Sequence, residues 1–216
     1  MIFSLLIACS SPPLWADVVV DAPGATGANF GDPTRATNGA RGGGDRSGGT
    51  DVYSMGLDAG VNDTLVLSWS GGQAVDGPGA DLVVFENPFD VASGGRFFDP
   101  LLVEVSADGD AWFAFPVDYL AADELAWSAD PSAWSGFAGV STVRLNEDTN
   151  PVDPFDAEAA GGDAFDLADV GLSAARYVRL TAAATQPNPD TDALFPRDPI
   201  SNGPDIDAVY ARELSP

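Results

Sequence analysis

The chain has 216 residues, 33 acidic residues against nine Arg, no Lys and no His, and a net charge of −24. This charge excludes a nucleic-acid-binding protein and electrostatic docking on anionic lipid, because both partners need a basic surface. The absence of His excludes Ser-His-Asp and Cys-His mechanisms and a His-bound zinc, and the single Cys excludes an intrachain disulfide. A hydrophobic fraction of 45% is enough to build a folded core.

The N-terminus predicts export. Cys9 follows the apolar run of residues 1–8 (MIFSLLIA), and LIAC resembles a bacterial lipobox, in which the Cys takes a lipid after cleavage. The departure is that residues 1–5 carry no positive charge, which a signal peptide should have. The alternatives are secretion with cleavage after Ala16, or a chance apolar N-terminus. We expect residues 1–16 to be leader and tether, Cys9 to be lipidated, and the mature protein to lie outside the cytoplasm, at the bacterial cell envelope or secreted. No run reaches the ~18 apolar residues of a transmembrane helix.

Short apolar or alternating runs predict strands along the chain. They cover residues 17–21, 64–69, 82–85, 101–115 as a hairpin around Asp108-Gly109, part of 134–145, 176–181 and 206–210. Residues 22–50 are Gly-rich and irregular. Residues 118–127 are predicted to form one short helix with Asp118 as its N-cap. Residues 17–216 are therefore predicted to form a single antiparallel β-sandwich.

Two groups of motifs resemble known families. Residues 103–112 (VEVSADGDAW), 175–180 (ARYVRL) and 205–210 (DIDAVY) resemble, in that order, the discoidin and galactose-binding-like jelly roll. This resemblance implies the jelly-roll form of the β-sandwich.

The second resemblance covers nearly the whole mature chain. Its motifs are GDP at 31–33, DGPG at 76–79, VFENPF at 84–89, GFAGV at 136–140 and GGDAFDL at 161–167. Together they resemble a largely uncharacterised family of bacterial cell-surface lipoproteins. The resemblance implies location and fold more than activity.

Carboxylates beside Gly, Pro or Asn, next to apolar runs, predict oxygen ligands for a hard cation such as Ca²⁺. The candidates are Asn29, Asp32, Asp81, Glu86, Asn87, Asp163, Asp166, Asp169, Asp205 and Asp207. In galactose-binding-like domains an acidic residue of the closing strand joins an N-terminal loop in holding a structural Ca²⁺. That resemblance implies Asp207 and the loop of residues 29–32. The alternative is that these residues cap turns and solubilise loop tips.

Candidate ligand-binding residues are aromatic. Trp127 and Trp134 bracket a polar loop and would offer stacking faces to sugar rings, and Arg96 with Phe97 would form a second binding edge. The alternatives are that Trp127 and Trp134 cover one end of the sandwich and that the residues of the second edge are ordinary packing. We therefore expect a non-enzymatic, lipid-anchored surface protein, stabilised by Ca²⁺, that recognises a glycan or another extracellular polymer. The alternatives are a structural or adhesion module without a small ligand, and a glycoside hydrolase that uses paired carboxylates.

Overall fold

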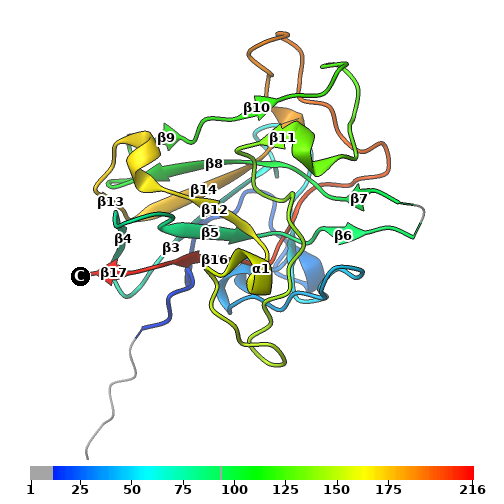
Figure 1. Cartoon of the computed structure of the whole chain (residues 1–216). Helices are drawn as coiled ribbons and strands as arrows, with labels where there is room; N and C mark the ends of the chain where they lie inside the picture. The colour runs from blue at the N-terminus through cyan, green and yellow to red at the C-terminus, as the bar shows by residue number, and fades with distance from the viewer. Residues whose placement is uncertain (1–11, 93) are drawn as a thin grey trace, which may run out of the picture.

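Strands dominate the computed structural model, which describes residues 12–92 and 94–216 (Figure 1). The predicted lipidation site Cys9 lies outside the described residues, so that prediction stays open. Within the described residues no helix combines the length and the apolar character that crossing a membrane requires.

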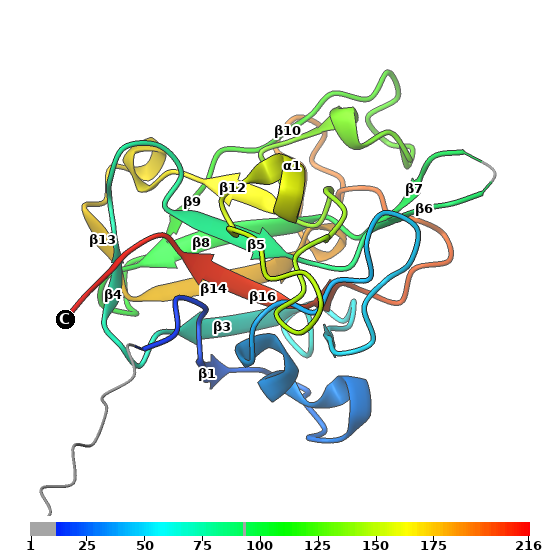
Figure 2. The ribbon, with the colours of Figure 1, turned by 60° about the horizontal axis from the view of Figure 1, so that its bottom comes forward.

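Two antiparallel sheets form the centre of the fold (Figures 1 and 2). The larger sheet has the strand order β1 (Val18–Asp21), β3 (Thr64–Ser68), β14 (Tyr177–Ala182), β8 (Leu101–Ser106) and β9 (Phe113–Ala114). The smaller sheet has the order β12 (Asp163–Phe165), β5 (Leu82–Phe85) and β16 (Ala208–Ala211). The central strand β14 is therefore paired with two strands that are distant from it in the sequence, β3 and β8.

One further three-stranded sheet and three two-stranded sheets contain the remaining strands of the described residues. They are β13 (Ala174–Ala175), β4 (Gln73–Val75) and β17 (Leu214–Ser215); β15 (Asp205–Ile206) with β2 (Tyr53–Ser54); β6 (Phe89–Asp90) with β7 (Arg96–Phe97); and β10 (Asp118–Tyr119) with β11 (Trp134–Ser135). One α-helix, α1 (Ala157–Ala160), and five 3₁₀ turns, η1 (Asn29–Gly31), η2 (Pro33–Thr37), η3 (Pro131–Ala133), η4 (Leu167–Val170) and η5 (Ala183–Thr185), complete the described elements.

The two sheets enclose one apolar core. Side chains that alternate along the strands of the larger sheet point inward, as a half-buried strand requires. The buried members are Leu65, Leu67, Val103, Val105, Val178 and Leu180 from the larger sheet, and Leu82, Val84, Phe165 and Val209 from the smaller one. The predicted antiparallel all-β sandwich is thus confirmed.

Irregular chain covers the other face of the smaller sheet. Val83 and Phe85 of β5 and Tyr210 of β16 pack there against Val143 and Leu145, which belong to the long segment before α1. Strand β5 is therefore buried on both faces. This explains why its four residues form an unbroken apolar run and not an alternating one.

The hairpin over residues 101–115 is confirmed, because β8 pairs with β9 across the Asp108-Gly109 turn. The helix predicted over residues 118–127 is wrong. Residues Asp118–Tyr119 form β10 and pair with β11, and the chain after them turns without a helix. Burial of Tyr119 in an aromatic cluster with Trp134 outweighs the helix propensity of the Ala, Asp and Glu residues that follow.

Candidate functional site

The outer face of the larger sheet carries a groove with a volume of about 500 Å³. Tyr177 and Arg179 of β14 face it, because the alternate residues Val178 and Leu180 point into the core. Trp112 lines it from the hairpin between β8 and β9. This face therefore combines the ring of Tyr177 and the guanidinium of Arg179 on the central strand with the ring of Trp112 on the adjacent hairpin.

The hairpin that presents Trp112 is held by its own hydrogen bonds. Ser106 Oγ accepts the backbone N–H of Gly109 at 2.8 Å, and Asp108 Oδ1 accepts those of Asp110 and Ala111, each at 2.9 Å. The indole Nε1 of Trp112 donates to the carbonyl of Gly109 at 3.1 Å. The hydrogen bond from Nε1 to Gly109 fixes the orientation of the Trp112 ring in the groove.

Arg179 is fixed in the same way. Its Nε and Nη2 donate to the two carboxylate oxygens of Glu104, the cross-strand partner on β8, at 2.6 and 2.7 Å. The guanidinium carbon lies 4.2 Å from the ring centroid of Trp112. A bidentate pair fixes the guanidinium plane, and the ring beneath it adds a cation–π contact. The three side chains form one preorganised unit.

Carboxylates surround the groove. Asp21, Asp108 and Asp110 are exposed and line it, whereas Asp63 is buried and accepts the Oγ1–H of Thr185 at 2.7 Å. The N–H groups of Ala111 and Asp110 lower the pKa of Asp108, so this carboxylate stays ionised as an acceptor. The groove therefore offers acceptors at its edge and flat surfaces on its floor.

A second site gathers three carboxylates at the start of β5. Oxygen atoms of Asp76, Asp81 and Asp166 lie within 4.8 Å of one another, a spacing that one ion can bridge since Ca²⁺ binds oxygens at about 2.3–2.6 Å. Asp81 is buried and accepts the N–H of Gly77 at 2.9 Å and of Leu167 at 2.8 Å. Burial raises the pKa of Asp81, and the charges of Asp166 and Asp76 raise it further. These three residues could hold a metal ion.

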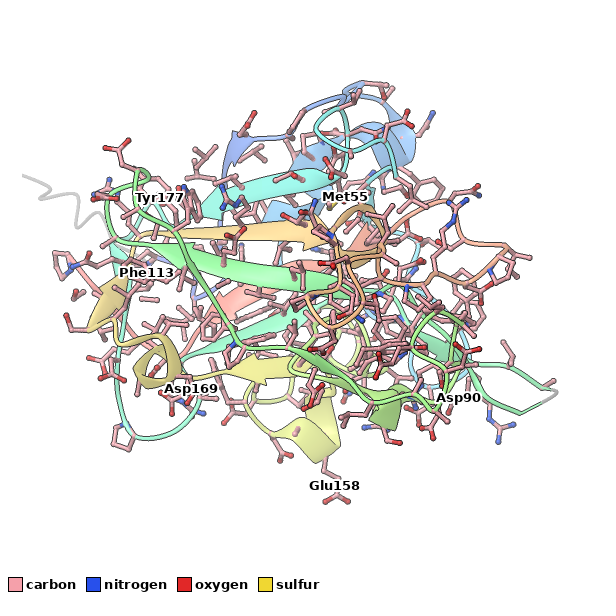
Figure 3. All side chains as sticks on the ribbon, turned by 90° about the horizontal axis from the view of Figure 1, so that it is seen from above. Met55, Asp90, Phe113, Glu158, Asp169 and Tyr177 are labelled. Atoms are coloured by element: carbon pink, nitrogen blue, oxygen red, sulfur yellow. The ribbon has the colours of Figure 1, made fainter. Side chains whose placement is uncertain are left out.

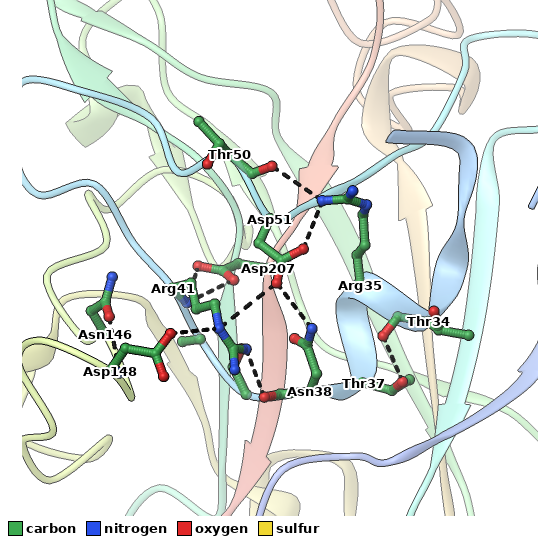
Figure 4. A network of polar contacts seen from close by, with 12 residues as sticks. Thr34, Arg35, Thr37, Asn38, Arg41, Thr50, Asp51, Asn146, Asp148 and Asp207 are labelled. Carbon is green, nitrogen blue, oxygen red and sulfur yellow. Dashed lines mark hydrogen bonds and ion pairs between the residues drawn. The ribbon is translucent and has the colours of Figure 1, made fainter. Parts of the chain in front are cut away.

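Asp207, the ligand expected from the resemblance, has other partners (Figure 4). It is 1% exposed, and both its oxygens accept the backbone N–H of Arg41 at 2.9 Å. The guanidinium of Arg41 lies 3.1 Å from Asp148 and 3.7 Å from Asp51. Burial raises the pKa of Asp207 to about 8; the N–H of Arg41 opposes this rise and the charge of Asp51 adds to it.

The expected partners of Asp207 do not join it. Within the described residues, no hydrogen bond connects Asp207 with Asn29 or Asp32. Asn29 begins η1 with a positive φ of 52°. Asp32 instead caps η2, accepting the N–H of Thr34 at 3.0 Å. This loop follows the alternative prediction, in which acidic residues cap turns.

The remaining candidates are spread over the fold. Asp163 accepts the N–H of Val140 at 3.0 Å, Asp169 is exposed in η4, and Asn87 binds the backbone of Gly49. Glu86 lies at the end of β5 opposite Asp81, five residues away along the strand, a span of about 17 Å. Asp205 accepts the hydroxyl of Ser54, and its backbone N–H donates to Oε1 of Glu86 at 2.7 Å. Among the predicted metal ligands, the structure therefore brings Asp81 close to Asp166 and Glu86 close to Asp205.

The predicted aromatic edge is mostly packing. Trp134 is 2% exposed inside a cluster with Phe98, and Trp127 is half-buried with its ring centroid 5.1 Å from that of Trp134. Arg96 donates to Asp90 at 2.9 Å and to the carbonyl of Val140, while Phe97 stacks on Phe89. Figure 3 shows Asp90 at the end of the molecule opposite Tyr177, so this edge and the groove are separate.

The residues of the groove were not predicted. Trp112 and Arg179 lie in the motifs VEVSADGDAW and ARYVRL, which indicated only the fold. The usable signal was the alternation of β14, which places Tyr177 and Arg179 on the face opposite the core. Asp76 was missed as well, although it precedes Asp81 in the same Gly-rich segment.

No protein-family model matches the chain, and the comparison with curated proteins finds no match either. The arguments for function therefore come from the groove and the carboxylate clusters. The two family resemblances stay predictions.

Proposed function

We propose that this chain is an exported, non-enzymatic surface protein, lipid-anchored through Cys9, that binds a neutral glycan in the groove of Trp112, Tyr177 and Arg179. Aromatic rings stack on the apolar faces of sugar rings, and the guanidinium and the carboxylates of Asp108 and Asp110 meet sugar hydroxyls. The net charge of −24 disfavours an anionic glycan.

The observation that carries this proposal is the preorganised unit of Trp112, Arg179 and Glu104. Two hydrogen bonds fix Arg179 on Glu104, and Trp112 packs against the guanidinium. Ordering a side chain on binding costs about 0.5–1.5 kcal/mol, and these side chains are ordered beforehand. Side chains held in one arrangement on an exposed face favour ligand recognition over a purely structural role.

The proposal is tested by glycan-array screening of the purified protein, followed by calorimetric titration of the best neutral glycan. We expect Trp112→Ala to weaken binding at least tenfold, which corresponds to about 1.4 kcal/mol, because the stacking face is lost. Trp127→Ala is the matched control, since Trp127 is also half-buried but lies outside the groove. Equal affinities of wild type and Trp112→Ala would refute binding in the groove.

In the same proposal, Ca²⁺ is the ion at Asp76, Asp81 and Asp166. Carboxylate oxygens are the ligands that Ca²⁺ prefers. Within the described residues none of the three forms an ion pair with Arg, so a cation would relieve their mutual repulsion. The backbone N–H groups that bind Asp81 leave lone pairs free on its oxygens.

Millimolar Ca²⁺ is therefore expected to raise the melting temperature beyond the effect of matched monovalent salt. A ligand at a hundredfold excess over Kd stabilises the folded state by about 2.7 kcal/mol. Asp76→Asn should remove most of this increment, because it removes one charged ligand oxygen from the cluster. The variant should fold, because the Asp76 side chain is exposed and the hydrogen bond of residue 76 to Ser173 runs through the backbone. Asp118→Asn, at another exposed Asp, should keep it. An increment that is the same in both variants would place the ion elsewhere.

A further inference from the structure

A buried carboxylate without a full set of partners lies at the end of β5. Glu86 is 3% exposed, and its Oε1 accepts the backbone N–H of Asp205 at 2.7 Å. Its Oε2 is buried and has no hydrogen-bond partner among the described residues. Burying an uncompensated carboxylate costs several kcal/mol, so a proton or a bound cation is needed at this position.

The neighbours of Glu86 are acidic too. Burial raises the pKa of Glu86 well above its usual value, and the charge of Asp99 adds to the rise. Asp99 is itself 6% exposed, with its pKa raised by burial to about 6. The charge of Arg197 lowers the pKa of Asp99, but within the described residues Arg197 forms no ion pair with any of these carboxylates. Burial and mutual repulsion therefore hold a proton on Glu86, and a positive charge placed beside Asp99 and Asp205 would favour the ionised forms of these carboxylates.

A pocket of about 190 Å³ opens next to this group. Asp99 and Asp205 line it with carboxylates, and Met55, Phe97 and Ile200 line it with apolar surface. This volume far exceeds that of a bare ion and matches a group of several carbon atoms. The pocket thus combines negative charge with a hydrophobic wall.

We propose that this pocket binds the ammonium group of a small organic amine. The ammonium carries three N–H donors and one positive charge, which meet the carboxylates of Asp99 and Asp205. Glu86 does not line the pocket but accepts the N–H of Asp205, so the added positive charge favours its ionised form. The carbon chain of the ligand lies on Met55 and Phe97, and the Phe97 ring also attracts the cation.

The placement of the carboxylates favours an amine over a metal ion. Within the described residues, Glu86, Asp99 and Asp205 do not converge as Asp76, Asp81 and Asp166 do, so a bare cation would not reach all three. The apolar wall would also contribute nothing to a metal. This pocket shares no lining residue with the groove, so the inference does not depend on the proposed glycan binding.

The test is calorimetric titration of the full chain at pH 8 with n-butylamine, and with n-butanol as the neutral analogue. We expect n-butylamine to bind and n-butanol not to bind. Asp99→Asn, which preserves size and removes a carboxylate from the pocket wall, should weaken n-butylamine binding at least tenfold. Glu86→Gln, which also preserves size, should weaken it by a smaller factor, because Glu86 lies outside the pocket lining and its pKa is raised. Asp118→Asn should leave binding unchanged. Circular dichroism of each variant verifies that it is folded.

Two further ligands identify the source of the amine. Glucosamine represents an amino sugar, and Nα-acetyl-lysine amide represents a Lys side chain of a peptide. The one that binds more tightly identifies the class of amine that the pocket prefers. The proposal is overturned if no amine binds, or if binding is equal in wild type, Asp99→Asn and Glu86→Gln. It is also overturned if Ca²⁺ displaces n-butylamine from the wild type, since the pocket would then be a site for a hard cation.

Discussion

Asp207→Asn is expected to raise the melting temperature at pH 9 and to change it little at pH 4. The folded-state pKa of Asp207 is about 8, raised from 3.8 by burial. A raised pKa stabilises the fold fully below pH 4, and this stabilisation is lost as the pH rises through 8. One pKa unit corresponds to about 1.4 kcal/mol, so the loss amounts to several kcal/mol. Asn mimics the protonated acid at every pH and still accepts the N–H of Arg41 with its oxygen.

Thermal denaturation of both proteins between pH 4 and pH 9 measures this effect. The wild type should lose stability over this range, and the variant should lose much less. Asp51 and Arg41, the charged groups that act on Asp207, are the same in both proteins, so the difference isolates residue 207. Asp118→Asn serves as the exposed control. Parallel curves for wild type and Asp207→Asn would show that Asp207 is ionised in the fold throughout.

Gly161→Ala is expected to destabilise the fold by roughly 2–6 kcal/mol, through backbone strain and overpacking together. Gly161 follows α1 with φ 73° and ψ −149°, a conformation that glycine adopts almost alone. An added Cβ would lie 1.8 Å from the carbonyl oxygen of Thr142, so the backbone would have to move. Since domains are stable by about 5–15 kcal/mol, much of the variant could be unfolded.

Gly171→Ala separates the cost of backbone strain from the cost of the steric clash. Gly171 also has a positive φ, 70°, with ψ 25°, but an added Cβ would meet no atom within 4 Å. The cost there is the left-handed conformation alone, about 1–2 kcal/mol. Urea denaturation of both variants gives the comparison. If Gly161→Ala is no less stable than Gly171→Ala, the close approach of residue 161 to Thr142 is not a feature of the fold.

The sheet could be predicted because local signals agree with tertiary burial there. The alternation over residues 64–69 and 176–181 identifies strands β3 and β14, and the Asp108-Gly109 turn identifies the hairpin. The helix prediction for residues 118–127 was wrong because packing of Tyr119 against Trp134 overrides helix propensity, which is a weak local preference. Pairing of distant strands, as in β14 with β3, has no local signal.

The metal ligands were harder to predict, because an Asp side chain can either cap a turn or bind a cation. Asp32 and Asp166 each cap a 3₁₀ turn, yet Asp166 alone also lies beside Asp76 and Asp81. Which carboxylates converge depends on the antiparallel pairing of β12 with β5, and this register cannot be read from the spacing of acidic residues. The partner of Asp207, a backbone N–H of an irregular segment, gives no sequence signal at all.

The most direct test of glycan binding in the groove is ¹⁹F NMR of the protein labelled with 5-fluorotryptophan. Its five Trp residues give five resonances, which single Trp→Phe variants assign. During titration with the neutral glycan selected on the array, the resonance of Trp112 should shift and saturate, because Trp112 lines the groove. The resonances of Trp127 and Trp134 should stay in place. A saturating shift at Trp127 with none at Trp112 would contradict the account.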